Sequence, residues 1–264
     1  MKVYKMNDLK IGVFDSGVGG LTVLKGLQEA LPHETFIYIG DNLHSPYGQK
    51  THAQLLEYTT EIVRYFISQN VKMIVLACNT TSCVVLEDLR KLFPQMPMLG
   101  VTDSTCELVK KDEFTKVCIM ATLATINSNA YQHKIGVDKT IGLPCPNLVP
   151  LIEEGASKEA IIDELHQLLD GPMKECDGIV LGCTHYPIVA SDIASLYPQA
   201  KLYSSSEAIV KDVTHYLEKN DLKATSKGKS VVYTTGDLFK FVQSASAFFD
   251  FKNYDVEMLE IEVE

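Results

Sequence analysis

Residues 72–80 read KMIVLACNT, and this stretch decides the class of fold. Its apolar residues are continuous rather than alternating with polar ones, which is typical of a strand buried on both faces of a parallel sheet. Residues 179–185 read IVLGCTH and repeat the pattern of a buried run, a cysteine and polar residues, so that 105 residues separate Cys78 from Cys183. Both stretches predict a strand of a parallel sheet that ends in a polar turn.

Short apolar runs of this kind alternate with amphipathic segments along most of the chain. Leucines and other apolar residues recur at three- and four-residue spacing over residues 21–31 and 51–69, which predicts helices there. Strands alternating with helices favour parallel sheets covered by helices, and therefore an α/β fold. The further predicted strands cover residues 10–15, 35–39, 98–101, 117–121, 201–203, 230–234 and 256–263.

A second internal similarity suggests two lobes. The strand that ends at Asp15-Ser16 matches the strand that ends at Ala121-Thr122, at an offset of 106 residues. Two nearly equal offsets favour two similarly built α/β lobes with the active-site cleft between them, although chance similarity between buried strands is the alternative. Because chain termini usually lie close together, the last segment is assigned to the first lobe. We predict a first lobe of residues 1–98 plus 208–264 and a second of residues 99–207.

Composition excludes several classes of protein. The 264 residues include 24 Lys and Arg against 34 Asp and Glu, and the net charge of −10 argues against binding to nucleic acid or to an acidic membrane surface. The apolar runs fall short of the ~18–20 residues that a membrane-spanning helix needs. The first ten residues lack the apolar stretch of a secretory signal, so we expect a cytoplasmic protein without a membrane partner.

The cysteines and histidines form no metal-binding or disulfide pattern. Seven cysteines is an odd number, no C-x-x-C occurs, and the seven histidines are scattered. We therefore expect neither a disulfide framework nor a bound metal ion. Cys145, which lies between two prolines, stays undecided; four other cysteines are expected to behave as small buried apolar residues, namely Cys83, Cys106, Cys118 and Cys176.

Polar clusters follow the predicted strands at the edge where ligands bind in open parallel sheets. These clusters are residues 15–17, 78–82, 122–125 and 183–187, and they converge if the two lobes face each other. Residues 15–20, DSGVGG, lack the G-x-G-x-x-G order of a dinucleotide-binding turn. We interpret them as a tight turn whose backbone N–H groups suit a carboxylate; the alternative is a plain turn with Ser16 as helix N-cap.

Two cysteines, Cys78 and Cys183, each end an apolar strand and open a turn rich in hydroxyl and amide groups. A helix N-terminus is expected to lower the pKa of such a thiol toward neutrality, where it can exchange protons. One thiolate and one thiol on opposite faces of a bound molecule could invert a stereocentre without a cofactor. Since free cysteines are often merely buried, residue patterns alone leave both interpretations open.

The motifs taken together resemble glutamate racemase. Any one of them is weak, but they occur in the family's order from about residue 11 to residue 240. The segment Thr184-His185 favours the glutamate enzymes over aspartate racemases, which more often have Glu in place of His. The motifs are DSGVGGL at 15–21, PYG at 46–48, ACNT at 77–80, CP at 145–146 with VPLIE at 149–153, LGCTHYP at 181–187 and YTTG at 233–236.

The resemblance implies a cofactor-independent isomerase that interconverts L- and D-glutamate and supplies D-glutamate for bacterial peptidoglycan. It implies two α/β lobes, Cys78 and Cys183 as the acid/base thiols, and Asp15 and His185 as groups that assist them. The small-molecule partner is glutamate, and the oligomeric state stays open between monomer and homodimer. The implied substrate-binding residues are Asp15, Ser16, Pro46, Tyr47, Gly48, Asn79, Thr80, Thr122, Thr184 and His185, with Glu153 and Asp41 as secondary groups near the cleft.

The chain departs from the family pattern at two places. Residues 204–206 are three serines where the family often has Asp-Ser, and residues 145–148 read CPNL rather than CPLF. The serine change puts the packing between the lobes in question more than the reaction. Four alternatives stay open: an aspartate racemase, an amino-acid-binding protein with inert thiols, a cysteine hydrolase, and a pyridoxal enzyme, for which no suitably placed Lys is seen.

Overall fold

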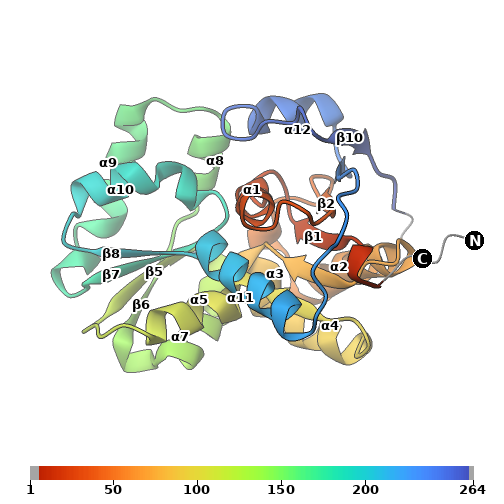
Figure 1. The fold of residues 1–264 in the computed structure, drawn as a ribbon. Helices are drawn as coiled ribbons and strands as arrows, with labels where there is room; N and C mark the ends of the chain where they lie inside the picture. Colours follow the sequence, from red (N-terminus) through yellow and green to blue (C-terminus); the bar gives the residue numbers. More distant parts are fainter. Residues whose placement is uncertain (1–5, 262–264) are drawn as a thin grey trace, which may run out of the picture.

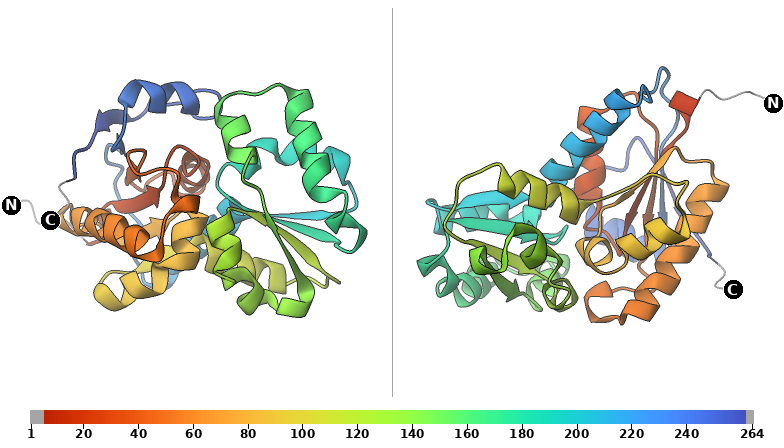
Figure 2. Two further views of the ribbon diagram at one scale, coloured as in Figure 1. Left: turned by 180° about the vertical axis from the view of Figure 1, so that it is seen from behind. Right: turned by 90° about the horizontal axis from the view of Figure 1, so that it is seen from below.

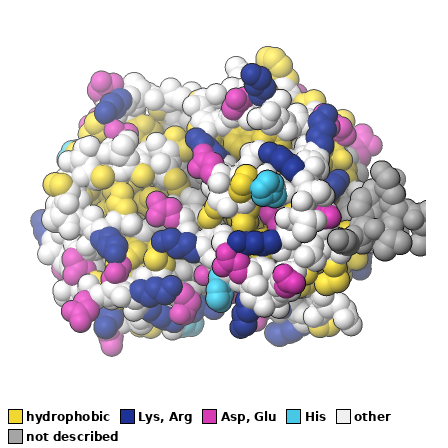
Figure 3. Space-filling model, in the orientation of Figure 1, with side chains coloured by type: hydrophobic (Ala, Val, Ile, Leu, Met, Phe, Trp, Pro, Cys, Tyr) yellow, Lys and Arg dark blue, Asp and Glu magenta, His cyan; other side chains and the backbone are white. Residues whose placement is uncertain are grey.

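The computed structural model describes residues 6–261 and consists of two lobes side by side (Figure 1). Each lobe is a parallel sheet with helices on both faces, so the predicted α/β class is confirmed. Among the described residues, no helix combines the length and the apolar character that a membrane crossing requires. On the face drawn in Figure 3, basic and acidic side chains are interspersed.

The first lobe contains a six-stranded sheet in the order β10-β9-β2-β1-β3-β4, with all neighbours parallel. Strands β1, β2 and β3 of this sheet are fully buried because helices cover both faces. The strands are β1 (Ile11–Asp15), β2 (Phe36–Gly40), β3 (Met73–Leu76), β4 (Met98–Gly100), β9 (Val231–Thr234) and β10 (Asp255–Met258).

Two hydrophobic clusters hold the helices of this lobe against the sheet. On one face lie α1 (Leu21–Ala30), α11 (Ser205–Lys219) and α12 (Leu238–Ala245). On the other face lie α2 (His52–Ser68) and α4 (Leu86–Leu92), next to the short α3 (Asn79–Val84). The start of α2 is fixed by a capping box, in which Thr51 and Gln54 satisfy each other's backbone N–H groups.

The second lobe contains a four-stranded parallel sheet in the order β6-β5-β7-β8. The strands are β5 (Val117–Ala121), β6 (Thr140–Pro144), β7 (Gly178–Gly182) and β8 (Lys201–Ser204). One face packs against α8 (Leu148–Glu153), α9 (Lys158–Leu169) and α10 (Ala190–Leu196), the other against α5 (Val101–Lys110) and α7 (Ala130–Ile135). The remaining helices are α6 (Leu123–Asn127), η1 (Met6–Asp8), η2 (Tyr47–Gln49), η3 (Val137–Lys139), η4 (Pro172–Lys174) and η5 (Tyr186–Val189).

The two sheets share one strand order, which explains the internal similarities of the sequence. In each sheet the first strand is central, with the second strand on one side and the third and fourth on the other: β2-β1-β3-β4 and β6-β5-β7-β8. Cys78 and Cys183 follow the third strands, β3 and β7, while Asp15 and Thr122 come at the ends of the first strands, β1 and β5. The matched stretches therefore occupy equivalent places in two similarly built lobes.

The predicted strands and the two predicted helices are found within a few residues of their expected bounds, with two corrections. Strand β6 (Thr140–Pro144) was not predicted, because Gly142 and Pro144 have low strand propensity and this half-exposed edge strand lacks a continuous apolar run. The strand predicted over residues 256–263 ends at Met258, and residues 262 and 263 lie outside the described part.

The chain returns to the first lobe after the second, since β9 and β10 join the first sheet. On the way, α11 runs along the junction and contacts α1 of the first lobe and α5 (Figures 1 and 2). The division into residues 1–98 plus 208–264 and residues 99–207 stays a prediction. Residues 99 and 100 pair with β3 as part of β4, so a boundary after residue 100 fits the sheet better.

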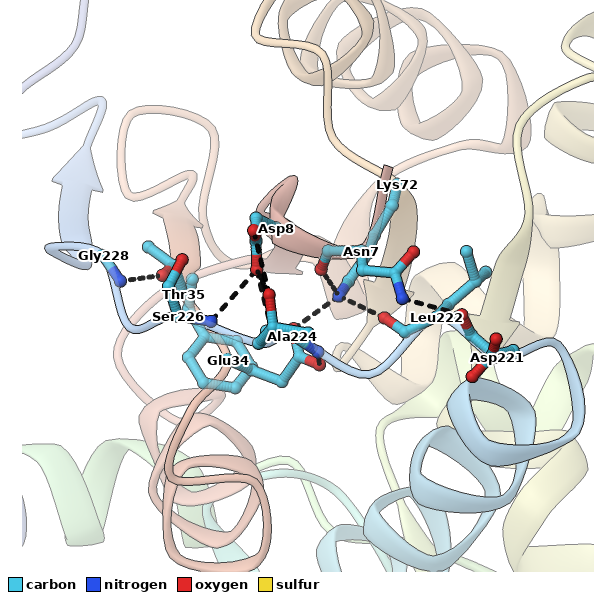
Figure 4. A network of polar contacts seen from close by, with 12 residues as sticks. Asn7, Asp8, Glu34, Thr35, Lys72, Asp221, Leu222, Ala224, Ser226 and Gly228 are labelled. Carbon is cyan, nitrogen blue, oxygen red and sulfur yellow. Dashed lines mark hydrogen bonds and ion pairs between the residues drawn. The ribbon is translucent and has the colours of Figure 1, made fainter. Parts of the chain in front are cut away.

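A buried ion pair ties the returning segment to the base of the first sheet (Figure 4). Lys72 Nζ lies 2.6 Å from Glu34 Oε2 and donates to the carbonyl oxygens of Asn7 and Leu222, each at 2.7 Å. The second Glu34 oxygen accepts from the N–H of Ala224 at 2.8 Å. Four separate parts of the sequence, at residues 7, 34, 72 and 222–224, are thereby joined beneath the sheet.

We predict that Lys72→Met lowers the free energy of unfolding by about 3–5 kcal/mol, because it leaves the Glu34 carboxylate buried without its counter-charge. The Lys72 side chain is fully buried. Urea denaturation measures the change. Lys91→Met is the control, since the Lys91 side chain is 76% exposed and should cost less than about 1 kcal/mol. Equal losses of unfolding free energy in the two variants would show that the buried ion pair stabilises the protein no more than an exposed lysine does.

Candidate active site

The candidate residues lie at the carboxyl ends of the central strands of both sheets. In each sheet, the connection after the first strand runs to one side and the connection after the third strand runs to the other. Open parallel sheets form a crevice at the point between two such strands. Asp15 ends β1 and Cys78 follows β3, whereas Thr122 follows β5 and Cys183 follows β7. The shared topology therefore supplies one cysteine from each lobe to the junction.

Cys78 is the N-cap residue of α3, and its thiol is 4% exposed. Its Sγ donates to Ser16 Oγ at 3.6 Å. Burial, with a smaller contribution from the nearby Asp15 carboxylate, raises the pKa of the Cys78 thiol to about 11. Hydrogen bonds with Thr81 and Ser16 lower this pKa but only partly offset the increase. The expectation that a helix N-terminus lowers this pKa was wrong for Cys78, because α3 has only six residues and desolvation dominates.

Asp15 connects the two halves of the site. Its carboxylate is fully buried, accepts the N–H of Gly17 at 3.0 Å and accepts the hydroxyl of Thr184, from the other lobe, at 3.4 Å. Burial raises the pKa of Asp15, while the nearby His185 imidazole works in the opposite direction. The carboxylate thus lies within electrostatic reach of both Cys78 and the turn that carries Cys183.

Cys183 forms a chain of contacts with His185 and Glu153. The Cys183 Sγ lies 3.7 Å from His185 Nδ1, and His185 Nε2 lies 2.8 Å from Glu153 Oε1. Burial by itself would lower the pKa of the His185 imidazole, but the contacts with Cys183 and Glu153 outweigh burial and raise this pKa to about 10. The imidazole therefore carries a positive charge at neutral pH, directly beside the second thiol.

Hydroxyl and amide groups join the lobes beside Cys78. The Thr80 hydroxyl lies 3.0 Å from that of Thr122 and 3.3 Å from that of Thr125. Asn79 accepts the Tyr131 hydroxyl at 2.6 Å and donates to Ser205 Oγ at 3.4 Å. Predicted binding residues Asn79, Thr80 and Thr122 are thus brought together at the junction.

Two glycines let the lobes approach closely. A Cβ on Gly19 would collide with the side chains of Thr184 and His185, and a Cβ on Gly48 would lie 2.8 Å from Thr122 Cβ. The DSGVGG turn therefore packs against the Cys183 turn. Ser16 is not a helix N-cap, because α1 begins at Leu21 with Gly20 in the cap position.

Tyr47 of the predicted Pro46-Tyr47-Gly48 segment is held by Asp41, which follows β2. Tyr47 is 2% exposed, and its hydroxyl donates to Asp41 Oδ2 at 2.6 Å. Asp41 also accepts the Thr235 hydroxyl at 2.6 Å and lies 2.8 Å from His44 Nδ1. Thr235 lies in the YTTG motif, but no role for Thr235 or His44 is predictable from sequence, since only the fold brings residues 41 and 235 together.

The other cysteines and the serine triplet have structural surroundings. Cys106, Cys118, Cys145 and Cys176 are buried in the two hydrophobic clusters of the second lobe, and the partly buried Cys83 contacts the Thr102 hydroxyl at 3.1 Å. Ser205 donates to the carbonyl oxygen of Leu181 at 3.2 Å and accepts from Asn79. Within residues 6–261, no group of three or more His, Cys, Asp or Glu is arranged to hold a metal ion.

The arrangement presents two buried thiols, one beside a carboxylate and one beside an imidazolium. Cys78, Cys183 and Asp15 are each less than 9% exposed, so water is largely excluded from them. Electrostatic interactions are stronger in such a site than in water. Its chemistry is the transfer of protons to and from sulfur, next to hydroxyl, amide and backbone donors that suit a carboxylate.

We predict that the contribution of His185 to stability declines as the pH rises. Because its pKa of about 10 lies above the ~6.5 of an unfolded chain, this contribution is complete below pH ~6.5 and is lost as the pH approaches 10. The difference in free energy of unfolding between the unmodified protein and His185→Gln should therefore shrink between about pH 7 and pH 10. Urea denaturation at several pH values measures it, and a constant difference contradicts the prediction.

Comparisons with known proteins identify the family and agree with the fold. The model of the "Asp/Glu/Hydantoin racemase" family matches residues 11–213. A glutamate racemase of Hydrogenobaculum sp. is 37% identical over 261 residues, covering 95% of this chain and 98% of the relative. Two crystal structures cover 98% of this chain with a TM-score of 0.91, each over 100% of its own length. They are glutamate racemase from Thermus thermophilus with beta-chloro-D-alanine, 34% identical, and from Francisella tularensis with D-glutamate, 32% identical. With this fold and these matches, the chain belongs to the Asp/Glu/hydantoin racemase family of isomerases.

Proposed function

We propose that this protein interconverts L- and D-glutamate without a cofactor, with Cys78 and Cys183 as the two acid/base groups. The observation that carries the proposal is that each lobe supplies one cysteine from the equivalent strand end, and that the Thr184 hydroxyl of one lobe donates to the Asp15 carboxylate of the other. The Francisella relative was crystallised with D-glutamate. Its 32% identity over nearly the whole chain supports the same substrate here.

The reaction needs one proton removed and one delivered at the same carbon. One cysteine, as thiolate, takes the Cα proton from one face; the electron pair of that C–H bond stays on the carbon and is delocalised toward the carboxylate. The other cysteine, as thiol, gives its proton to the opposite face. The configuration inverts, the two sulfurs exchange protonation states, and no electrons are gained or lost.

The Cα proton is far less acidic than a thiol proton. The site must therefore stabilise the negative charge that develops on the substrate when this proton is removed. We assign this role to hydroxyl and amide donors around the substrate carboxylate, in a site from which water is excluded. Holding Cα between two thiols also removes the entropic cost of encounter. The substrate-binding residues we propose are Asp15, Ser16, Pro46, Tyr47, Gly48, Asn79, Thr80, Thr122, Thr184 and His185.

Asp15 and His185 are proposed to assist the two thiols in different ways. His185 supplies a positive counter-charge when Cys183 is a thiolate, and Glu153 holds the imidazole in place at 2.8 Å. Asp15 and burial keep Cys78 protonated, since its pKa is about 11. The ammonium group of glutamate brings a positive charge that opposes the effect of Asp15, so substrate binding favours the Cys78 thiolate.

We further propose that the enzyme works in the cytoplasm and supplies D-glutamate for peptidoglycan, as its family resemblance implies. Glutamate is the proposed small-molecule partner, and the choice between monomer and homodimer stays open. Because the two thiols are almost fully buried, the lobes must separate to admit substrate and release product.

Cys78→Ala and Cys183→Ala should each reduce racemisation by at least about 10²-fold, because each removes one of two proton-transfer groups. Chiral chromatography after incubation with L-Glu measures the loss, and L-Asp in a parallel reaction tests the aspartate alternative. Cys83→Ala and Cys106→Ala are the matched controls and should keep turnover near that of the unmodified protein. Full turnover by either of the first two variants would eliminate the two-thiol mechanism.

Incorporation of solvent deuterium at Cα distinguishes proton exchange with L-glutamate from proton exchange with D-glutamate. In heavy water the unmodified protein should introduce deuterium at Cα of both glutamate enantiomers, followed by NMR. Cys78→Ser and Cys183→Ser should each exchange the proton of only one enantiomer, if they exchange it at all, because one face has lost its thiol. Glutamate binding with no deuterium entry by the unmodified protein would identify an amino-acid-binding protein instead.

Gly48→Ala should lower kcat/KM by roughly 10–100-fold, because the new Cβ would lie 2.8 Å from Thr122 Cβ and hold the lobes apart. The control is Gly171→Ala, where an added Cβ meets nothing within 4 Å. Steady-state kinetics on both variants make the comparison. Unchanged kinetics for Gly48→Ala would show that this contact does not determine closure.

A further inference from the structure

We infer that His44 is a positioning residue that sets the affinity for substrate by holding the Pro46-Tyr47-Gly48 segment through Asp41. The inference rests on the proposed function, since that segment is proposed to bind glutamate. His44 itself is one-quarter exposed and has no contact with either cysteine among the hydrogen bonds of the described residues. Its effect must therefore pass through another side chain.

Asp41 is that side chain, because it accepts hydrogen bonds from two residues of its own loop, His44 and Tyr47, and from the distant Thr235. The carboxylate is 1% exposed and accepts Tyr47 OH at 2.6 Å, Thr235 OH at 2.6 Å and His44 Nδ1–H at 2.8 Å to one oxygen and 3.0 Å to the other. The N–H of Asp41 donates to the carbonyl oxygen of Asp15 at 2.9 Å. The carboxylate orientation that suits Tyr47 is thus fixed by its neighbours.

The His44 ring is oriented by stacking on Tyr58 of α2. Their ring centroids are 3.8 Å apart with an interplanar angle of 14°, and Tyr58 also lies against the ring of Tyr47 at 6.4 Å. His44 also lines a cavity of about 280 Å³ together with Glu61 and Leu259. The stack on Tyr58 and the hydrogen bond to Asp41 therefore hold the imidazole at the wall of this cavity.

The segment held in this way lies against the second lobe. Tyr47 directly precedes Gly48, whose backbone packs against Thr122 so closely that a Cβ would not fit. A small rotation of the Asp41 carboxylate would move Tyr47 and shift this contact. Loss of the His44 donor is therefore expected to weaken substrate binding while leaving the two thiols, and thus the proton-transfer steps, in place.

Two substitutions separate the hydrogen bond from the aromatic stack. His44→Phe keeps a flat ring for Tyr58 and removes the N–H donor, whereas His44→Asn keeps an N–H donor at a similar position and removes the ring. We expect His44→Phe to raise KM roughly tenfold with kcat changed less than about threefold, and His44→Asn to restore KM to within about threefold. Melting temperatures of both variants check that the fold is unchanged.

Hydrogen–deuterium exchange of the backbone amides of residues 47–50 gives a second readout that needs no substrate. Exchange should be faster in His44→Phe than in the unmodified protein or in His44→Asn. If the unmodified protein does not racemise glutamate, the proposed function fails, and the exchange rates still test the positioning role. Unchanged exchange and KM in His44→Phe, equal impairment of both variants, or a loss confined to kcat would each overturn the inference.

Discussion

The parallel direction of the strands is the constraint on which this molecule depends. In a parallel sheet every strand ends at the same edge, so the turns after β1 and β3 must lie together, as must those after β5 and β7. Because the two sheets have the same strand order, each lobe carries its cysteine at the equivalent place. The proposed pairing of Cys78 with Cys183 follows from this repetition of one topology in two lobes.

Burial then determines the chemistry of those groups. Removing Asp15 and Cys78 from water favours their neutral forms, and the pKa values of both rise. His185 is equally buried, yet its contacts with Cys183 and Glu153 are strong enough to keep it charged. The two thiols therefore sit in opposite surroundings, one beside a carboxylate and one beside a cation, although the lobes that hold them are alike.

The first lobe is made from two distant parts of the chain, and polar contacts join them. Lys72 and Glu34 connect the amino end of the sheet to the segment after α11 (Figure 4). At the carboxyl end of the sheet, Thr235, which follows β9, donates to the Asp41 carboxylate. The returning segment thus completes the sheet and also contributes a donor near the candidate site. A chain that ended after α11 would lack β9, β10 and Thr235 alike.

Much of the fold could be predicted from sequence because it follows from local periodicity. Continuous apolar runs such as residues 73–78 are typical of strands in a covered parallel sheet, and the polar turns after them mark the edge where ligands bind. The edge strand β6 was missed because Gly142 and Pro144 give it no such run. The candidate residues themselves were named from motifs, and most of them do meet at the junction.

The sequence by itself determined the fold class, the internal similarity between the two lobes and the residue types available for chemistry. These features can be read from the sequence because they depend on the spacing between near neighbours. Only the tertiary structure decided the direction of the Cys78 pKa, the link from Cys183 through His185 to Glu153, and the gathering of His44, Tyr47 and Thr235 around Asp41. The reason is physical. Desolvation and hydrogen bonding depend on which groups surround a side chain in space, and those groups come from segments up to about 190 residues apart.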